Sequence, residues 1–172
     1  VLGGGELNDS ELLKILNNKG YQVKKKNCHL VDVSLLKENK SCLFIVSNFI
    51  NLSEECKNFF INNIDYIIYE HDHKYLKRRN PALFKEFLAP KDEIINLDFY
   101  KSAKKIFCQS SFHKNIVFKN TNLDNLESLS GNLWPIETLE FIRKLSKENK
   151  QDKCSIMNST TPHKNTHGGI RY

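Results

Sequence analysis

The chain has 172 residues, of which 40% are hydrophobic, so it can bury one substantial core and at most the beginning of a second. Its net charge of +6 comes from lysine-rich runs that are short, far apart and not interleaved with aromatic residues. This pattern favours a solvated basic surface and argues against a nucleic-acid partner. No apolar run approaches the roughly 20 residues that span a bilayer.

The five cysteines are widely spaced, odd in number and without the close pairs that bind zinc or do redox chemistry. We therefore expect free thiols and a cytoplasmic location, with peripheral membrane contact left open. The chain begins without Met, and residues 170–172 read as the start of a helix. We expect it to be truncated at both ends.

Short apolar runs alternate with amphipathic segments along the chain, which predicts βα units and a Rossmann-like parallel sheet flanked by helices. Val1 and Leu2 are expected to close a first strand. Asn8 or Asp9 is expected to cap a helix that ends at Gly20. The tract 21–26 is expected to form a second strand near an edge of the sheet.

Residues 42–46 are continuously apolar, which predicts a strand buried on both faces, and Ser53 is expected to begin the next helix. The run 64–69 predicts another buried strand. Four polar residues follow it directly: Glu70, His71, Asp72 and His73. Because open α/β sheets bind ligands at the carboxyl ends of their strands, these residues are candidates for a site.

The segment 74–96 contains two prolines and no clear periodicity, which predicts a long connection with one short helix near 82–87. We then expect, in chain order, a helix over 98–103, a strand over 105–108, a helix over 112–119 capped by Ser110 or Ser111, and a strand over 126–129.

The last part of the chain is expected to begin a second domain. A helix over 135–149 starts at a proline, a polar linker follows, and residues 154–157 predict a new short strand. We therefore divide the chain into an acceptor-side domain, 1–150, and the beginning of a second Rossmann-like domain, 151–172. An exposed apolar face near 133–142 is expected where a second domain would dock.

Five short sequence segments, taken in chain order, resemble motifs of the retaining glycosyltransferases of the two-Rossmann-domain (GT-B) class, group 1 or family 4-like. They are the glycines Gly3, Gly4 and Gly5 after the first strand, IIYEHDH with His71 and Asp72, SAKKIFCQSSFHKNIV with Ser110 or Ser111, LESLSGN before the linker, and NSTTPHKNT with Lys164.

The resemblance implies transfer of a sugar from a nucleotide-sugar donor to a sugar, lipid or protein acceptor, with no metal and no cofactor. Such chemistry uses helix N-termini, backbone amides and a lysine to stabilise the departing diphosphate. It implies that His71 is the catalytic residue, which hydrogen-bonds the sugar or the acceptor. The implied substrate-binding residues are Gly3, Gly4, Gly5, Asp72, His73, Ser110, Ser111 and Lys164.

Other interpretations of the same residues stay open. The glycines could form a tight strand-to-helix turn, Glu70 could pair with Lys74, Arg78 or Arg79, and the serines could act as helix caps. A non-catalytic Rossmann-like binding module is the main alternative function. A metal-dependent hydrolase would require His71, His73, His163 and His167, or three of them with a carboxylate, to converge.

Overall fold

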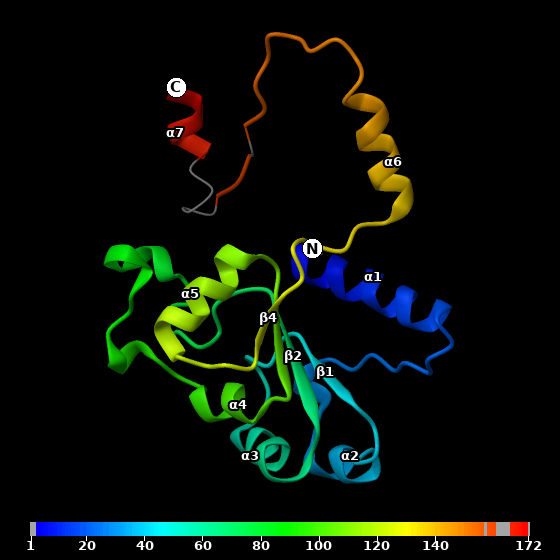
Figure 1. Cartoon of the computed structure of the whole chain (residues 1–172), viewed down its shortest axis with the longest axis vertical. Helices are drawn as coiled ribbons and strands as arrows, with labels where there is room; N and C mark the ends of the chain where they lie inside the picture. The colour runs from blue at the N-terminus through cyan, green and yellow to red at the C-terminus, as the bar shows by residue number, and fades with distance from the viewer. Residues whose placement is uncertain (1–2, 157, 161–165, 172) are drawn as a thin grey trace. The chain divides into compact units, whose positions relative to one another are not determined.

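The computed structural model describes residues 3–156, 158–160 and 166–171, and Figure 1 shows its helices and strands. The chain divides into two compact units, Val1–Trp134 and Pro135–Tyr172. This division falls before the helix that follows Pro135, whereas the sequence places the domain boundary at residue 150. The assignment of two functional domains stays a prediction.

The first unit holds a four-stranded parallel sheet, which confirms the Rossmann-like α/β prediction. Its strands are β1 (Phe44–Val46), β2 (Tyr66–Glu70), β3 (Lys105–Cys108) and β4 (Leu126–Ser128). They lie side by side in chain order, and every neighbouring pair is parallel. All four carboxyl ends therefore meet at one edge of the sheet.

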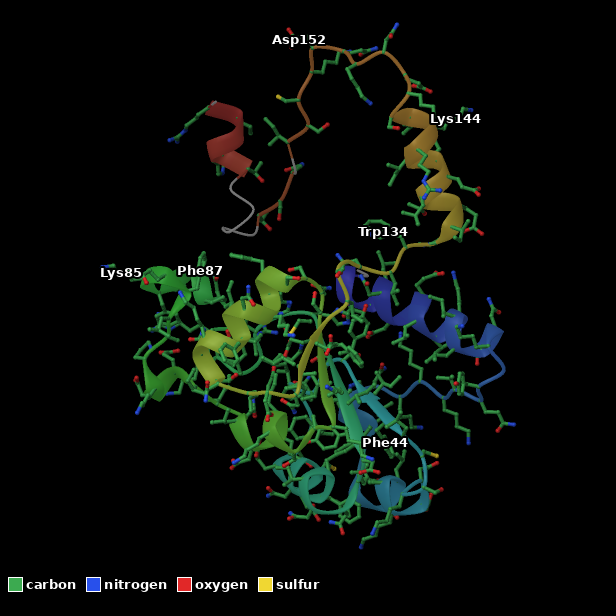
Figure 2. All side chains as sticks on the ribbon, in the orientation of Figure 1. Phe44, Lys85, Phe87, Trp134, Lys144 and Asp152 are labelled. Atoms are coloured by element: carbon green, nitrogen blue, oxygen red, sulfur yellow. The ribbon has the colours of Figure 1, made fainter. Side chains whose placement is uncertain are left out.

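One face of the sheet carries the hydrophobic core. In the register of the ladders, Tyr66, Ile68 and Glu70 share a face with Ile106 and Cys108. Four helices contribute buried side chains to this core: α2 (Val33–Glu38), α3 (Glu54–Asn63), α4 (Leu97–Ser102) and α5 (Ser111–Thr121). Phe44, labelled in Figure 2, packs edge-on against Phe60 of α3 with 5.2 Å between ring centroids.

Three α-helices of the first unit, α2, α3 and α5, begin at side-chain caps. Asp32 accepts a hydrogen bond from the backbone of Leu35, Ser53 from Cys56, and Ser110 from His113. These bonds satisfy amides that have no partner within the first turn. The predicted helix starts at Ser53 and at Ser110 are confirmed.

Helix α1 (Gly4–Asn18) begins earlier than the sequence predicts. Gly3 is its N-cap, and the Glu6 carboxylate accepts a hydrogen bond from the Gly3 amide at 3.0 Å. Asn8 and Asp9 therefore lie inside the helix and do not cap it. Gly4 and Gly5 form its first turn, so the glycine-rich loop is a helix N-terminus. The predicted strand end at Val1 and Leu2 lies outside the described residues.

The prediction of a strand over 21–26 is wrong, because these residues have no regular secondary structure. Tyr21 is 63% exposed and Lys24 to Lys26 are all exposed. A strand needs a partner for its ladder, and this lysine-rich tract joins none. It leads instead into a short 3₁₀ helix, η1 (Cys28–Leu30), and the well-packed α2.

The connection after β2 contains three 3₁₀ helices, η2 (Pro81–Leu83), η3 (Lys85–Phe87) and η4 (Lys91–Glu93). The single short helix predicted over 82–87 is thus wrong in detail. Glu86 and Phe87 have positive φ angles of 53° and 62°, which a continuous helix does not allow. An isolated antiparallel bridge between Leu76 and Ile94 closes the connection at its base.

The second unit contains α6 (Ile136–Leu145) and α7 (Thr166–Arg171). Helix α6 begins after Pro135 as predicted and exposes Ile136, Phe141 and Ile142 by half or more of their surface. The strand predicted over 154–157 is not formed at 154–156, and Met157 lies outside the described residues. Within the described part of the chain, no helix is long and apolar enough to cross a membrane.

Candidate functional site

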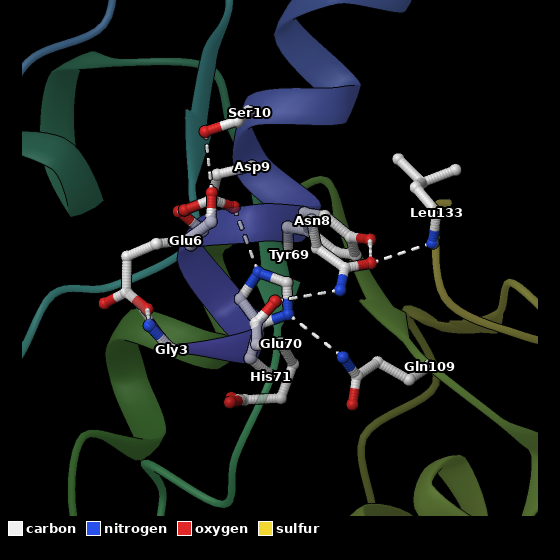
Figure 3. Close-up of polar contacts among 12 residues, drawn as sticks. Gly3, Glu6, Asn8, Asp9, Ser10, Tyr69, Glu70, His71, Gln109 and Leu133 are labelled. Carbon is white, nitrogen blue, oxygen red and sulfur yellow. Dashed lines mark hydrogen bonds and ion pairs between the residues drawn. The ribbon is translucent and has the colours of Figure 1, made fainter. Parts of the chain in front are cut away.

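Three polar side chains directly follow three neighbouring strands. Ser47 follows β1, His71 follows β2 and Gln109 follows β3, so all three stand at the carboxyl edge of the sheet. Asp9 of α1 lies among them: Ser47 Oγ donates to Asp9 Oδ2 at 2.8 Å, and His71 Nε2 lies 3.0 Å from Asp9 Oδ1. Gln109 Nε2 lies 3.1 Å from His71 Nδ1 (Figure 3).

The charge of Asp9 fixes the tautomer of His71. Burial opposes ionisation of Asp9, but hydrogen bonds from His71 and Ser47 outweigh it, so the pKa of Asp9 is lowered. A carboxylate only accepts, so His71 Nε2 carries a proton, and Nδ1 accepts from the Gln109 amide. Both ring nitrogens are engaged, and the His71 side chain is 12% exposed.

The N-terminus of α1 lies against the His71 ring. A Cβ atom added to Gly5 would stand 3.4 Å from His71 Cδ2, whereas one added to Gly4 would meet nothing within 4 Å. A helix N-terminus carries partial positive charge and free amides, which suit an anion. In this structure the Glu6 carboxylate takes that place at the Gly3 amide.

Asn8 fastens α1 to the sheet. Its Oδ1 accepts from the Tyr69 hydroxyl at 3.1 Å and from the Leu133 amide at 2.8 Å, and its Nδ2 donates to the Gly4 carbonyl at 2.9 Å. Asn8 is only 7% exposed. Asn8 therefore joins the start of α1 to β2 and to the chain after β4, and Figure 3 draws these contacts.

The opposite face of the same strand end holds a buried charged cluster. Glu70 is fully buried and accepts from the Tyr100 hydroxyl, from Lys74 Nζ at 2.9 Å and from the Asp72 amide at 3.0 Å. Lys74 Nζ also lies 2.5 Å from Asp72 Oδ1, and Arg79 Nη1 lies 3.2 Å from Asp72 Oδ2. The suggested pairing of Glu70 with Lys74 is confirmed.

Burial and neighbouring charge set the ionisation of this cluster. Complete burial raises the pKa of Glu70, although Lys74 and Tyr100 counteract it. Burial would lower the pKa of Lys74, but Glu70 and Asp72 more than compensate and raise it. Three donors and no acceptor face Glu70, so we treat it as a carboxylate paired with the Lys74 ammonium. The cluster anchors the connection to β2.

His73 and His113 form a second buried pair. Their ring centroids are 4.5 Å apart, and burial lowers the pKa of His73 to about 3 and that of His113 to about 4. Within the described residues, His73 Nδ1 and His113 Nε2 are buried without a hydrogen-bond partner. Both rings are therefore neutral near pH 7, and His73 packs against His113 of α5.

The structure thus separates the candidate residues into groups. It brings Gly5 next to His71, leaves Gly3 and Gly4 in the same helix start without a contact to His71, places Asp72 in the Glu70 cluster, and places His73 against His113. Ser110 caps α5, and Ser111 Oγ lies 3.4 Å from Ser128 Oγ. Lys164 lies outside the described residues.

The histidines that a metal-dependent hydrolase would require do not form a metal centre in the described part of the chain. Among residues 3–156, 158–160 and 166–171, no group of three or more His, Cys, Asp or Glu side chains could hold a metal ion. His163, one of the four histidines considered, lies outside these ranges. The five cysteines are all described, and each is unpaired.

The sequence interpretation missed Asp9, Ser47 and Gln109 as members of the site. Ser47 and Gln109 carried a usable signal, because each is the first polar residue after a predicted strand. Asp9 carried none, because its contact with His71 joins a helix and a strand end that are distant in the sequence.

No protein-family model matches this sequence, and no curated protein or solved structure matches it. The function is therefore inferred from the residues and their geometry.

Proposed function

We propose that this chain is the acceptor-side half of a glycosyltransferase that moves a sugar from a nucleotide-sugar donor to an acceptor without a metal. One observation supports it most directly. The glycine-rich N-terminus of α1 and His71, two features that resemble glycosyltransferase motifs separately in the sequence, lie in contact at the carboxyl end of β2. This edge is where open α/β sheets bind their ligands.

The chemistry of glycosyl transfer suits this pair of features. Negative charge builds on the departing diphosphate, and the free amides and positive end of a 15-residue helix stabilise it. The glycines let a phosphate approach the backbone of the first turn closely. The exposed Glu6 carboxylate, which bonds the Gly3 amide, swings away when the diphosphate takes its place.

His71 hydrogen-bonds a sugar hydroxyl in this proposal. Its Nδ1 atom accepts from Gln109 in the free protein, and a substrate hydroxyl replaces the Gln109 amide on the same nitrogen. Asp9 and Ser47 act as positioning residues, because they hold the ring with its proton on Nε2. Lys164 contacts the donor diphosphate, as the resemblance implies.

A non-catalytic binding module is the second candidate. It is favoured by the fact that both ring nitrogens of His71 already have partners within the chain, which is typical of a structural histidine. In that case the same edge would bind a sugar phosphate and would not turn it over.

The test is transfer and hydrolysis of a panel of nucleotide sugars by the full-length natural protein, with His71→Ala and Lys164→Ala as variants. His29, an exposed residue of η1, provides the control substitution His29→Ala. We expect turnover of one donor, unaffected by chelator and by His29→Ala and lost in both site variants. Saturable binding without turnover would favour the module, and chelator-sensitive hydrolysis would refute the transferase.

A further inference from the structure

A second feature of the carboxyl edge is a hollow of about 540 Å³ on the side of the sheet that α3 covers. Its walls come from the loop after β1, the first turn of α3 and the long connection after β2. None of the residues bonded to His71 lines it. A concave site of this volume is large enough for a small organic ligand.

Three cationic side chains line this hollow. They are Lys57, Lys77 and Arg79. Lys57 is buried, with a side chain that is 11% exposed, and its Nζ lies 2.6 Å from Glu54 Oε1. Arg79 pairs with Asp72, while the exposed Lys77 makes no ion pair with any described residue. The carboxylates do not balance the cations, so the hollow attracts an anion.

The backbone of the hollow is held in an unusual conformation at two positions. Arg79 and Asn96 both have left-handed φ angles, of 52° and 55°, although neither is glycine. This conformation is costly for arginine, whereas asparagine adopts it more readily. The Asn96 side chain accepts from Lys57 Nζ at 3.1 Å and donates to the Lys74 carbonyl at 3.0 Å. Asn96 therefore holds the buried Lys57 in place.

The hollow also has an apolar part. Leu76 is fully buried, Ile95 is partly buried and Ile50 is 42% exposed, and all three line it. A ligand that fills both parts carries an anionic group for Lys77 and Arg79 and a short apolar body for Ile50 and Ile95, behind which Leu76 is buried.

We propose that this hollow binds a small oxyanion, a phosphate monoester or a carboxylate, joined to a short apolar segment. The site is separate from the His71 group and does not rest on glycosyl transfer. Lys77 and Arg79 bind the oxyanion, Lys57 supports it from the buried wall, and Ile50 and Ile95 bind the attached body.

The probe is hexyl phosphate, titrated into the isotope-labelled full chain and followed by the NMR shifts of its backbone amides. We expect saturable shifts at Lys57, Lys77, Arg79 and Asn96. Lys77→Gln should weaken binding about tenfold, because one charge-assisted hydrogen bond is lost. Hexanoate, inorganic phosphate and hexanol identify the group that is bound. Tighter binding of hexyl phosphate or hexanoate than of hexanol and inorganic phosphate supports the proposal. The tighter of these two ligands identifies which oxyanion the site binds.

Arg78→Gln is the matched control. Arg78 stands between the two exposed cations in sequence, is 67% exposed, lies 3.9 Å from Glu93 and does not line the hollow. The substitution Arg78→Gln removes one positive charge, as Lys77→Gln does, and should leave the affinity for hexyl phosphate unchanged. Equal loss in the two variants would show diffuse charge attraction and overturn the proposal. Absence of shifts at millimolar probe, or equal binding of hexanol, would also overturn it. Circular dichroism checks that each variant is folded.

Discussion

Among single residues, Glu70 combines complete burial with a full set of donors around its carboxylate. It stands at the end of β2, one residue before His71, so it also determines where the chain leaves the sheet. A buried charge is tolerated only when its partners are present, because the cost of removing it from water is large. The stability of the protein should therefore fall sharply when either Glu70 or one of its partners is replaced.

Glu70→Gln should destabilise the protein by about 3–5 kcal/mol, because it leaves the Lys74 ammonium buried with only Asp72 as counter-charge. Its new amide group also faces the Tyr100 hydroxyl, which donates to Glu70. Urea unfolding at pH 7 measures this loss. Glu127→Gln, at an exposed position of β4, should change the free energy of unfolding by less than about 0.5 kcal/mol. Equal effects in the two variants would contradict this account of Glu70.

The buried His73 and His113 make stability depend on pH. Their pKa values, about 3 and about 4 in the folded chain against 6.5 when exposed, mean that the unfolded chain binds more protons below pH 6.5. Burial is the main cause; Lys74 lowers both values and Asp72 raises both. The contribution of these two neutral histidines to the free energy of unfolding is therefore fully present above pH 6.5. It is lost as the pH falls toward 4, by about 1 kcal/mol per pH unit for each histidine.

His113→Gln removes one of these groups and should flatten the dependence of unfolding free energy on pH between 6.5 and 4.5. Urea titrations at several pH values measure the slope. His29→Gln is the control, because His29 is exposed and should leave the slope unchanged. A His113→Gln slope equal to that of the natural protein would show that His113 is protonated in the folded chain.

At the scale of elements, α1 is joined to the sheet mainly by polar contacts. Asn8 bonds Tyr69 and Leu133, and Asp9 bonds Ser47 and His71. By contrast, α2 to α5 contribute to the hydrophobic core. Helix α1 is thus the element whose position responds most to a single polar substitution.

Asn8→Ala should destabilise α1 by about 2 kcal/mol, because the Tyr69 hydroxyl and the Leu133 amide lose a buried acceptor. Hydrogen exchange should accelerate in the amides of α1 and remain slow in β2 and β3. Asn18→Ala, at the exposed end of the same helix, should leave exchange unchanged. Uniform acceleration over the whole first unit would show that α1 does not open by itself.

The apolar runs of the sequence predict all four strands to within two residues. The prediction that 42–46 is buried on both faces is wrong, because β1 is an edge strand of the sheet and Ile45 is 38% exposed. The same reasoning fails for 21–26, where composition permits a strand but no partner is available. It also fails at Gly3 to Gly5, because the Glu6 carboxylate starts α1 early. Within the candidate site, His71 is identifiable from its position after a strand, whereas Asp9 depends on a long-range contact that local pattern does not encode.

At the scale of the whole molecule, the described hydrophobic core lies entirely in the first unit. Its buried members run from Leu36 to Leu126, and none belongs to the second unit. The fragment Val1–Trp134 should therefore fold by itself, with a free energy of unfolding within about 1 kcal/mol of that of the full chain. Circular dichroism and urea unfolding of the fragment measure this. A disordered fragment would contradict it.

Strand β2 has a further consequence for the molecule as a whole. In its first four residues, Tyr66 to Tyr69, each face of the strand carries one tyrosine and one isoleucine, so hydrophobicity does not distinguish the two faces. A slip by one residue would exchange those faces, and would turn His71 inward and Glu70 toward α1. Only the inward position gives Glu70 its three donors. The buried carboxylate therefore fixes the register of β2, and this register in turn places His71 on the face of the sheet that α1 covers.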